Sequence, residues 1–401
     1  MTKMMALMRL RAGPIFMVAV VTAIICCGAP VYAGSLTDQF KDTDGWMDMS
    51  DWVLNNATGF MPVPIIITEP AVEQGLGLAA LFFHPPKDYE EKDFADAGQE
   101  TAEGSGDFVL PDVTAVAAAK TGNGSWLVGG GHFAHWKNDH IRYEGIAGYA
   151  SINLTFYGSA GSTSFDDGLK FNGEGFMTQQ PISFRWKDTD FFLGAEYDYS
   201  NVKTEFEFGL ALPPGAPVPS LDTQLSAIGG FLYYDSRDTP FTPSAGLEAK
   251  LRVMRNDDAI GSDFDYTSTL AFARKYFKLN DKWVLGLRVE AEFVSGDVPF
   301  YMLPFISMRG IPAMRYQGDA VALVESEVRW AFHPRFSAIG FVGAGKAAET
   351  FGDFSDSPAR AVQGLGFRYF IARKLGMHAG IDVAKGPEDT YWYLTMGGAW
   401  H

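Results

Sequence analysis

The chain has little of three things: cysteine, positive charge and long apolar runs. Its only two cysteines are Cys26 and Cys27, near the N-terminus. It has 32 Lys and Arg against 48 Asp and Glu, a formal net charge of −16. This acidic balance argues against nucleic-acid binding and against binding of anionic lipid through a basic surface. After residue 33 no apolar run is long enough for a membrane-spanning helix.

The first 33 residues have the pattern of a secretory signal peptide. Three basic residues (Lys3, Arg9 and Arg11) precede an apolar run over 15–27, and small residues at Val31 and Ala33 suit cleavage after Ala33. A membrane anchor fits less well because the apolar run is short and soon broken. A lipoprotein signal also fits less well, since the cysteines follow two isoleucines rather than a small residue. Cleavage would remove both cysteines, excluding disulfides, and would shift the net charge from −16 to −19.

What the chain does have is glycine, aromatic residues and alternation. It contains 44 Gly and 32 Phe, and 47% of its residues are hydrophobic. In residues 283–293 apolar side chains alternate with polar ones, and the same period of two recurs in 191–199, 321–332 and 376–383. Each such segment predicts a strand with one apolar and one polar face.

Strand length and loop length predict a membrane barrel. Many segments run about ten residues or more, which suits tilted membrane crossing better than a soluble sandwich. Short turns alternate with long loops, as in outer-membrane barrels. We expect an all-β, transmembrane antiparallel barrel over 62–401, preceded by a short N-terminal segment over 34–61 with a brief helix over 48–56. A secreted soluble β protein is the alternative. Residues 85–107 are acidic and read as a loop.

Counting back from the C-terminus gives sixteen strands. The first, with Pro62 and Pro64, is included because bacterial barrels have even strand numbers, although proline cannot donate to a ladder. The expected strands cover residues 62–68, 72–83, 109–120, 125–137, 140–157, 171–187, 190–206, 223–235, 246–256, 264–278, 281–295, 320–333, 335–346, 358–371, 374–385 and 389–401.

Two stretches resemble the bacterial surface antigen family, the BamA/TamA superfamily of outer-membrane proteins. Residues 234–246 resemble its strand-turn-strand motif, which includes Asp235, Arg237, Asp238, Pro243 and Gly246. Met308-Arg309-Gly310-Ile311 resembles its Val-Arg-Gly-Tyr/Phe loop motif, between the eleventh and twelfth expected strands. The resemblance covers the second half of the chain well and the first half only as a pattern.

The resemblance implies that this loop folds into the lumen, where Arg309 meets carboxylates of the wall. Alternation points Glu325 and Glu327 inward, so we expect them to be its partners, since a charge away from water needs one. A solvated Arg309 is the alternative. The family often has an aspartate where this chain has Gly343, which leaves more to the two glutamates. The family's protein-assembling and protein-secreting members carry periplasmic POTRA domains, for which residues 34–61 leave no room.

The two edge strands form a candidate lateral seam. Gly397 and Gly398 weaken the expected last strand, which runs on to Trp400, and prolines weaken the first. Related barrels are thought to open there. The glycines could instead relieve crowding in the wall.

Other motif matches give weaker evidence of function. Near matches to phosphate-binding and dinucleotide-binding loops, at 340–346 and 75–80, lie in strand patterns without a following helix. His132 and His135 face opposite sides of a strand, which argues against a metal site with His140. We therefore expect no metal, no cofactor and no catalytic residue.

The leading hypothesis is a Gram-negative outer-membrane barrel that transports or inserts protein or lipid. The alternative is a structural or solute-conducting barrel without a polypeptide client. An outer-membrane enzyme is a third reading, for which no catalytic triad is evident. Expected partners are outer-membrane lipid, a protein client or a second copy of the chain, and the barrel assembly machinery for its own insertion.

Overall fold

A computed structural model describes residues 40, 42, 44–50, 59–84, 112–157, 159–160, 163–164, 167–207, 219–398 and 400. The expected signal peptide over 1–33, the acidic loop over 85–107 and most of the helix expected over 48–56 lie outside these residues. Within them no helix is long and apolar enough to span a membrane.

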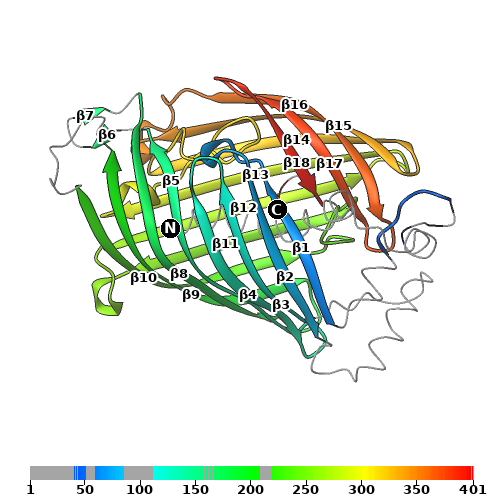
Figure 1. The fold of residues 1–401 in the computed structure, drawn as a ribbon, viewed down its shortest axis with the longest axis horizontal. Coiled ribbons are helices and arrows are strands. Elements are labelled where there is room, and N and C mark those ends of the chain that lie inside the picture. The colour runs from blue at the N-terminus through cyan, green and yellow to red at the C-terminus, as the bar shows by residue number, and fades with distance from the viewer. Residues whose placement is uncertain are drawn as a thin grey trace, which may run out of the picture.

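Sixteen strands form one sheet, in which each strand pairs antiparallel with its neighbours in the chain (Figure 1). The expected all-β, sixteen-stranded barrel is confirmed. The strands are β1 (Gly59–Ile67), β2 (Gly75–His84), β3 (Asp112–Thr121), β4 (Trp126–Trp136), β5 (Ile141–Phe156), β8 (Leu169–Arg185), β9 (Phe191–Glu207), β10 (Ser220–Asp235), β11 (Gly246–Asn256), β12 (Tyr266–Lys278), β13 (Trp283–Gly296), β14 (Ala320–His333), β15 (Phe336–Ala348), β16 (Arg360–Ala372), β17 (Met377–Lys385) and β18 (Thr390–Met396).

Smaller elements lie in the loops. A separate two-stranded sheet pairs β6 (Ser159–Ala160) with β7 (Thr163–Ser164). Four 3-10 turns are η2 (Pro70–Val72), η3 (Asp258–Ile260), η4 (Phe300–Met302) and η5 (Phe351–Asp353). None of these interrupts the wall of the barrel.

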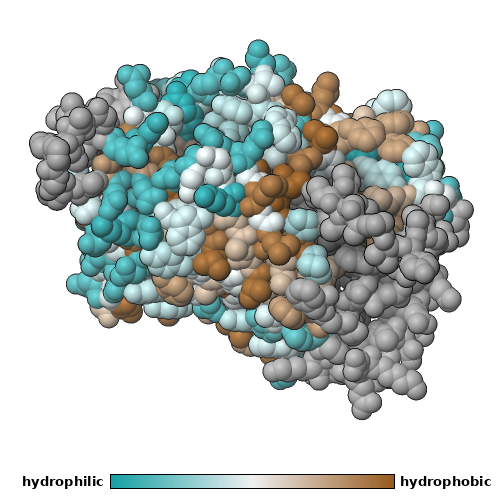
Figure 2. Space-filling view, in the orientation of Figure 1, coloured by the Kyte–Doolittle hydropathy of each residue, from teal (hydrophilic) through white to brown (hydrophobic). Residues whose placement is uncertain are grey.

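The two faces of the wall differ as the alternation predicts. Large apolar side chains point outward and are exposed, as at Leu76 (68%) and Leu365 (72%), whereas many buried side chains of the inner face are charged. In Figure 2 apolar side chains gather across the middle of the visible face, and hydrophilic ones toward the long-loop end. An apolar outer band around a polar interior is the arrangement of a membrane barrel.

Most connections sort by end, except that the β2–β3 and β10–β11 connections are long and the β3–β4 and β17–β18 connections are short for their ends. Short turns join β4 to β5, β8 to β9, β12 to β13, β14 to β15 and β16 to β17, all at the end where the chain enters β1. We call this the short-turn end. The opposite, long-loop end carries the connections β5–β8, β9–β10, β13–β14 and β15–β16. The β6–β7 hairpin marks the long-loop end in Figure 1.

The sheet order begins with β1 and ends with β18, and no ladder joins these two fully described strands. We call the gap between them the seam. The proline-containing first strand is confirmed, since Pro62 lies opposite Ala80 and Pro64 opposite Leu78. The last strand differs from the prediction: β18 ends at Met396, five residues before the expected end at 401.

Candidate functional site: a plugged lumen beside an unpaired seam

The loop over 297–319, which we call the plug loop, folds into the barrel from the long-loop end. Its residues Ile306, Met308 and Ile311 are buried and pack with apolar side chains of β14 and β16. Gly310 has a φ of +93°, which only glycine adopts without strain, and a Cβ there would lie 3.1 Å from the backbone nitrogen of Gly386. The Gly310 N–H donates to the Tyr393 hydroxyl at 2.9 Å. The loop is thereby fixed against the last two strands.

Arg309 is buried at the tip of this loop. Its Nη1 lies 2.6 Å from Oδ2 of Asp382, and its Nη2 lies 2.8 Å from Oε2 of Glu327. The guanidinium carbon sits 3.5 Å above the ring centroid of Phe341. Two carboxylates and an aromatic face surround the cation, as a charge away from bulk water requires.

Glu325 has a different partner from the one expected. Its Oε2 accepts from Nη1 of Arg288 at 2.5 Å, and the same arginine contacts Glu290 at 2.8 Å. Arg288 also donates to the carbonyl oxygen of Ser307 at 3.1 Å. Glu325 therefore holds the loop indirectly, through Arg288, while Glu327 touches Arg309 itself.

Asp382, on β17, is the carboxylate that the sequence interpretation missed. It accepts from Arg309 and from Nη2 of Arg368, at 2.6 and 2.9 Å. Of the two glutamates expected to take the load left by Gly343, Glu327 bonds to Arg309, and Asp382 supplies the second carboxylate. A Cβ at Gly343 would lie 2.7 Å from Cγ of Glu325, so no side chain fits there. The alternation over 376–383 places Asp382 on the polar face of its strand, and this pattern could have identified it as a candidate partner of Arg309.

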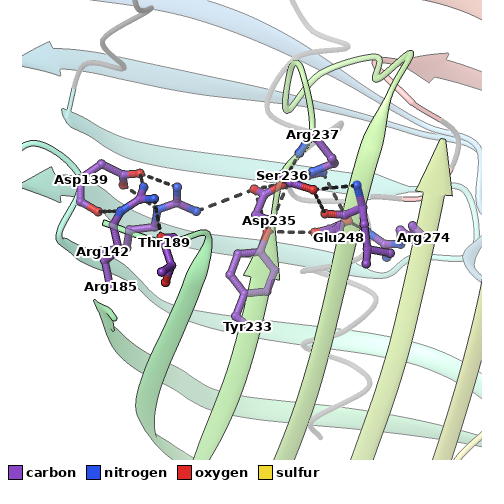
Figure 3. A network of polar contacts seen from close by, with 11 residues as sticks. Asp139, Arg142, Arg185, Thr189, Tyr233, Asp235, Ser236, Arg237, Glu248 and Arg274 are labelled. Carbon is purple, nitrogen blue, oxygen red and sulfur yellow. Dashed lines mark hydrogen bonds and ion pairs between the residues drawn. The ribbon is translucent and has the colours of Figure 1, made fainter. Parts of the chain in front are cut away.

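The strand-turn-strand motif forms a second polar network at the short-turn end (Figure 3). Arg237 donates to both carboxylate oxygens of Asp235, at 2.8 and 2.9 Å, and lies 3.3 Å from Glu248. Glu248 also accepts from Arg274 at 2.9 Å. On the other side, Arg142 of β5 lies 3.8 Å from Asp235. The network joins β10 to strands on both sides of it.

The turn over 236–245, which we call the strap, crosses the mouth of the barrel. Asp238 accepts the N–H of Ser244 at 2.9 Å and so closes the turn, and Gly246 resumes the wall with a φ of +105°. Ser244 then accepts from Nη2 of Arg329, on β14, at 2.7 Å, and the carbonyl of Pro243 accepts from the same nitrogen at 3.3 Å. The motif thus places one segment against a distant part of the wall.

The strap also reaches the end of the sheet that borders the seam. Thr239 Oγ1 donates to the carbonyl of Leu375 at 3.4 Å, and the His378 N–H donates to Thr242 Oγ1 at 3.2 Å. The Gly398 N–H donates to the carbonyl of Phe241 at 2.5 Å. The strap therefore covers the short-turn end of the lumen and braces β17 and the residues after β18.

The C-terminal residues correct the predicted seam. Gly397 has a φ of +77° and turns the chain off the strand, so Gly397 and Gly398 follow β18 rather than weaken it. Trp400 is 4% exposed, with its ring centroid 6.0 Å from that of Tyr276. A Cβ at Gly286 would lie 2.9 Å from Cζ3 of Trp400, so this glycine of β13 makes room for the indole. Trp400 packs on β12 and β13 and not at the edge of the sheet.

The described residues offer little for a cofactor. One group of three carboxylates could hold a metal ion, namely Asp257, Asp258 and Asp265 in the β11–β12 loop, and such acidic groups are common without one. Of the histidines considered above, His132 contacts Thr114 at 2.9 Å, whereas His140 contacts Asp188 at 3.3 Å.

Comparison with known proteins gives a superfamily match over part of the chain. Residues 149–307 match the Omp85 superfamily domain. This part of the chain is similar to Omp85-type barrels, and the resemblance to the BamA/TamA superfamily is confirmed at this level. The described part of the chain has no POTRA-like domain. No curated protein matches it.

Solved structures share the fold. BamA from Haemophilus ducreyi lacking POTRA domains 1-3 is 13% identical with a TM-score of 0.56, and the match covers 84% of this chain and 70% of that one. CdiB from Acinetobacter baumannii is 10% identical (TM-score 0.52) and CdiB from Escherichia coli 10% (TM-score 0.54). Both matches cover 84% of this chain, and they cover 59% and 62% of the respective CdiB chains.

Proposed function

We infer that this protein resides in the Gram-negative outer membrane and moves protein or lipid into or across it through the seam. The observation that carries the inference is the contrast between the lumen and the wall. The lumen is filled from both ends, by the loop over 297–319 and by the strap, while β1 and β18 share no ladder. A route through the wall has fewer contacts to break than a route down the axis.

The contacts inside the lumen are costly to break. Arg309, Arg288 and Arg368 are all buried and paired with buried or half-buried carboxylates. Separating such a pair leaves an uncompensated charge and costs about 3–5 kcal/mol. Between β1 and β18 themselves there is no ladder to break, since β18 has only seven residues and the two prolines of β1 cannot donate hydrogen bonds.

A solute-conducting or structural barrel is the competing function, with or without a second copy of the chain. It requires an aqueous path through the lumen, and the buried plug argues against one. Steady conductance of the purified wild-type protein in planar bilayers would favour this reading. We expect only brief and infrequent openings.

Crosslinking the seam tests the proposal. The mature chain is expected to have no cysteine of its own, so one cysteine in β1 and one in β18 would form a single disulfide. Oxidation should abolish the function, read as the protein and lipid composition of the outer membrane relative to a deletion strain, and reduction should restore it. The matched control joins positions 63 and 79, which already face each other across the β1–β2 ladder. If the oxidised seam variant worked as well as the reduced one, transport through the wall would be excluded.

A further inference from the structure

A short N-terminal segment docks on the short-turn end of the barrel. We call residues 42 and 44–50 the clasp. Three of its carboxylates converge on Arg335, which lies in the turn between β14 and β15. Arg335 Nη2 lies 2.7 Å from Asp42, Nε lies 2.7 Å from Asp44, and Nη1 lies 2.6 Å from Asp48. The Arg335 side chain is completely buried by these contacts.

Further bonds hold the clasp to β16 and to the turn between β16 and β17. The Met49 N–H donates to the carbonyl of Ile371 at 2.7 Å, and the Lys374 N–H donates to Ser50 Oγ at 3.0 Å. The Tyr369 hydroxyl donates to the carbonyl of Met47 at 2.5 Å. Arg373 adds a more exposed contact with Asp42 at 3.0 Å. All these partners lie on the β18 side of the seam.

The chain leads from the clasp into β1, on the other side of the seam. Met49 is buried in the same apolar cluster as Met61 and Val63 of β1 and Met396 of β18. The clasp is therefore joined covalently to one edge of the sheet and by polar contacts to the other.

The opposite end of the seam is tied by the plug loop. The Ala313 N–H donates to Glu69, in the β1–β2 connection, at 3.2 Å. Arg315 lies 3.2 Å from Glu388, in the β17–β18 connection. The seam thus has one tie at each end and no ladder between them.

The clasp is built to be released. Three aspartates face two arginines, the buried Arg335 and the more exposed Arg373, and leave an excess of one negative charge. The side chains of Asp42 and Asp44 are 27% and 29% exposed, so salt and water reach their side of the cluster. Repulsion among the carboxylates limits the strength of the tie, whereas an apolar seal would be permanent.

We propose that the clasp is a releasable lock on the seam, held by the Arg335–aspartate cluster, and that its release precedes separation of β1 from β18. The proposal rests on the proposed function only in taking the seam as the route. The lock itself is a structural claim and can be measured without any transport assay.

Spin labels on outward-facing positions test it. One label replaces Ile66 on β1 and the other replaces Ile381, a 50% exposed residue of β17, so the pair spans the seam. Pulsed electron spin resonance then gives the fraction of molecules with a widened distance. We expect Arg335→Gln to raise this fraction at least threefold. Arg373→Gln, at a 41% exposed side chain with contacts to the same aspartates, is the matched control and should change it less than twofold.

A second variant guards against misfolding. The double variant Asp42→Asn with Asp44→Asn alters only half-exposed groups, and it should also raise the fraction of molecules with a widened distance. In the wild type, 1 M salt should raise the same fraction. Heat-modifiable migration in gels verifies that each variant is folded. An unchanged distance in folded Arg335→Gln protein would overturn the lock, whatever the crosslinking result. A widened seam combined with a harmless seam disulfide would leave the lock standing and remove the proposed function.

Discussion

At the scale of the residue, the lumen is organised by arginines that share carboxylates. Asp382 forms ion pairs with both Arg309 and Arg368, and Arg288 forms ion pairs with both Glu290 and Glu325. Alternation in the sequence predicted which side chains point inward. It could not predict the pairing, because partners on different strands are set by the register and by the path of the loop. Asp382 was missed for this reason, since it lies 73 positions from Arg309.

A double-mutant cycle distinguishes the coupling of Arg309 to Glu327 from its coupling to Glu325. Arg309→Ala should lower the free energy of unfolding by about 3 kcal/mol, because it strands buried carboxylates. Combined with Glu327→Gln, the losses should be less than additive by about 1 kcal/mol or more. Combined with Glu325→Gln they should be closer to additive, since Glu325 is bonded to Arg288. Urea unfolding in lipid vesicles measures both cycles. Equal coupling for the two glutamates would contradict the geometry.

Asp44 gives the clasp a defined response to acid. Its hydrogen bond with Arg335 lowers the pKa of Asp44 from 3.8 to about 2. A carboxyl group whose pKa is lowered by folding adds stability above pH 3.8, and that contribution disappears as the pH falls through about 2. Carbon-detected nuclear magnetic resonance of the Asp44 carboxyl group should show the low value in the wild type. In Arg335→Gln the pKa should return toward 3.8, and an unchanged titration would mean that another group holds Asp44.

At the scale of the element, the strands were predictable and the ends of the chain were not. The period of two located fifteen of the sixteen strands, and the even strand number of bacterial barrels added the first with its prolines. The same period ran on past Met396, since Trp400 continues the alternation of β18. The strand nevertheless ends at Met396, because the chain turns at Gly397 with a positive φ and Trp400 fills the space left by Gly286 on a distant strand. Neither feature appears as a local pattern in the sequence.

The seat of Trp400 can be tested at Gly286. Gly286→Ala places a methyl group 2.9 Å from the indole, so Trp400 must shift. We expect the C-terminal residues to become several-fold more accessible to carboxypeptidase in folded protein. Gly340→Ala is the control, because its nearest neighbour would be 3.9 Å away, and it should behave as the wild type. Equal digestion of both variants would show that Trp400 does not anchor the C-terminus.

At the scale of the whole molecule, sequence patterns predicted a barrel and the family resemblance implied a loop in its lumen, but neither indicated how the ends are closed. The strap, the clasp and the C-terminal residues each bind a part of the chain remote from their own. Such contacts leave no periodic signal, because each depends on where the completed wall brings two turns together. The resemblance identified the strap motif without indicating that it reaches Arg329.

The contacts of the clasp also bear on the order in which the protein folds. Asp42 and Arg335 are 293 positions apart, and Ser50 and Lys374 are 324 apart. The clasp leaves the ribosome among the first residues of the chain, yet its binding surface exists only after β14 to β17 have joined the sheet. Contacts of such long range form late in folding. Closure of the clasp would therefore mark the completion of the barrel, and its aspartates would keep the waiting segment soluble until then.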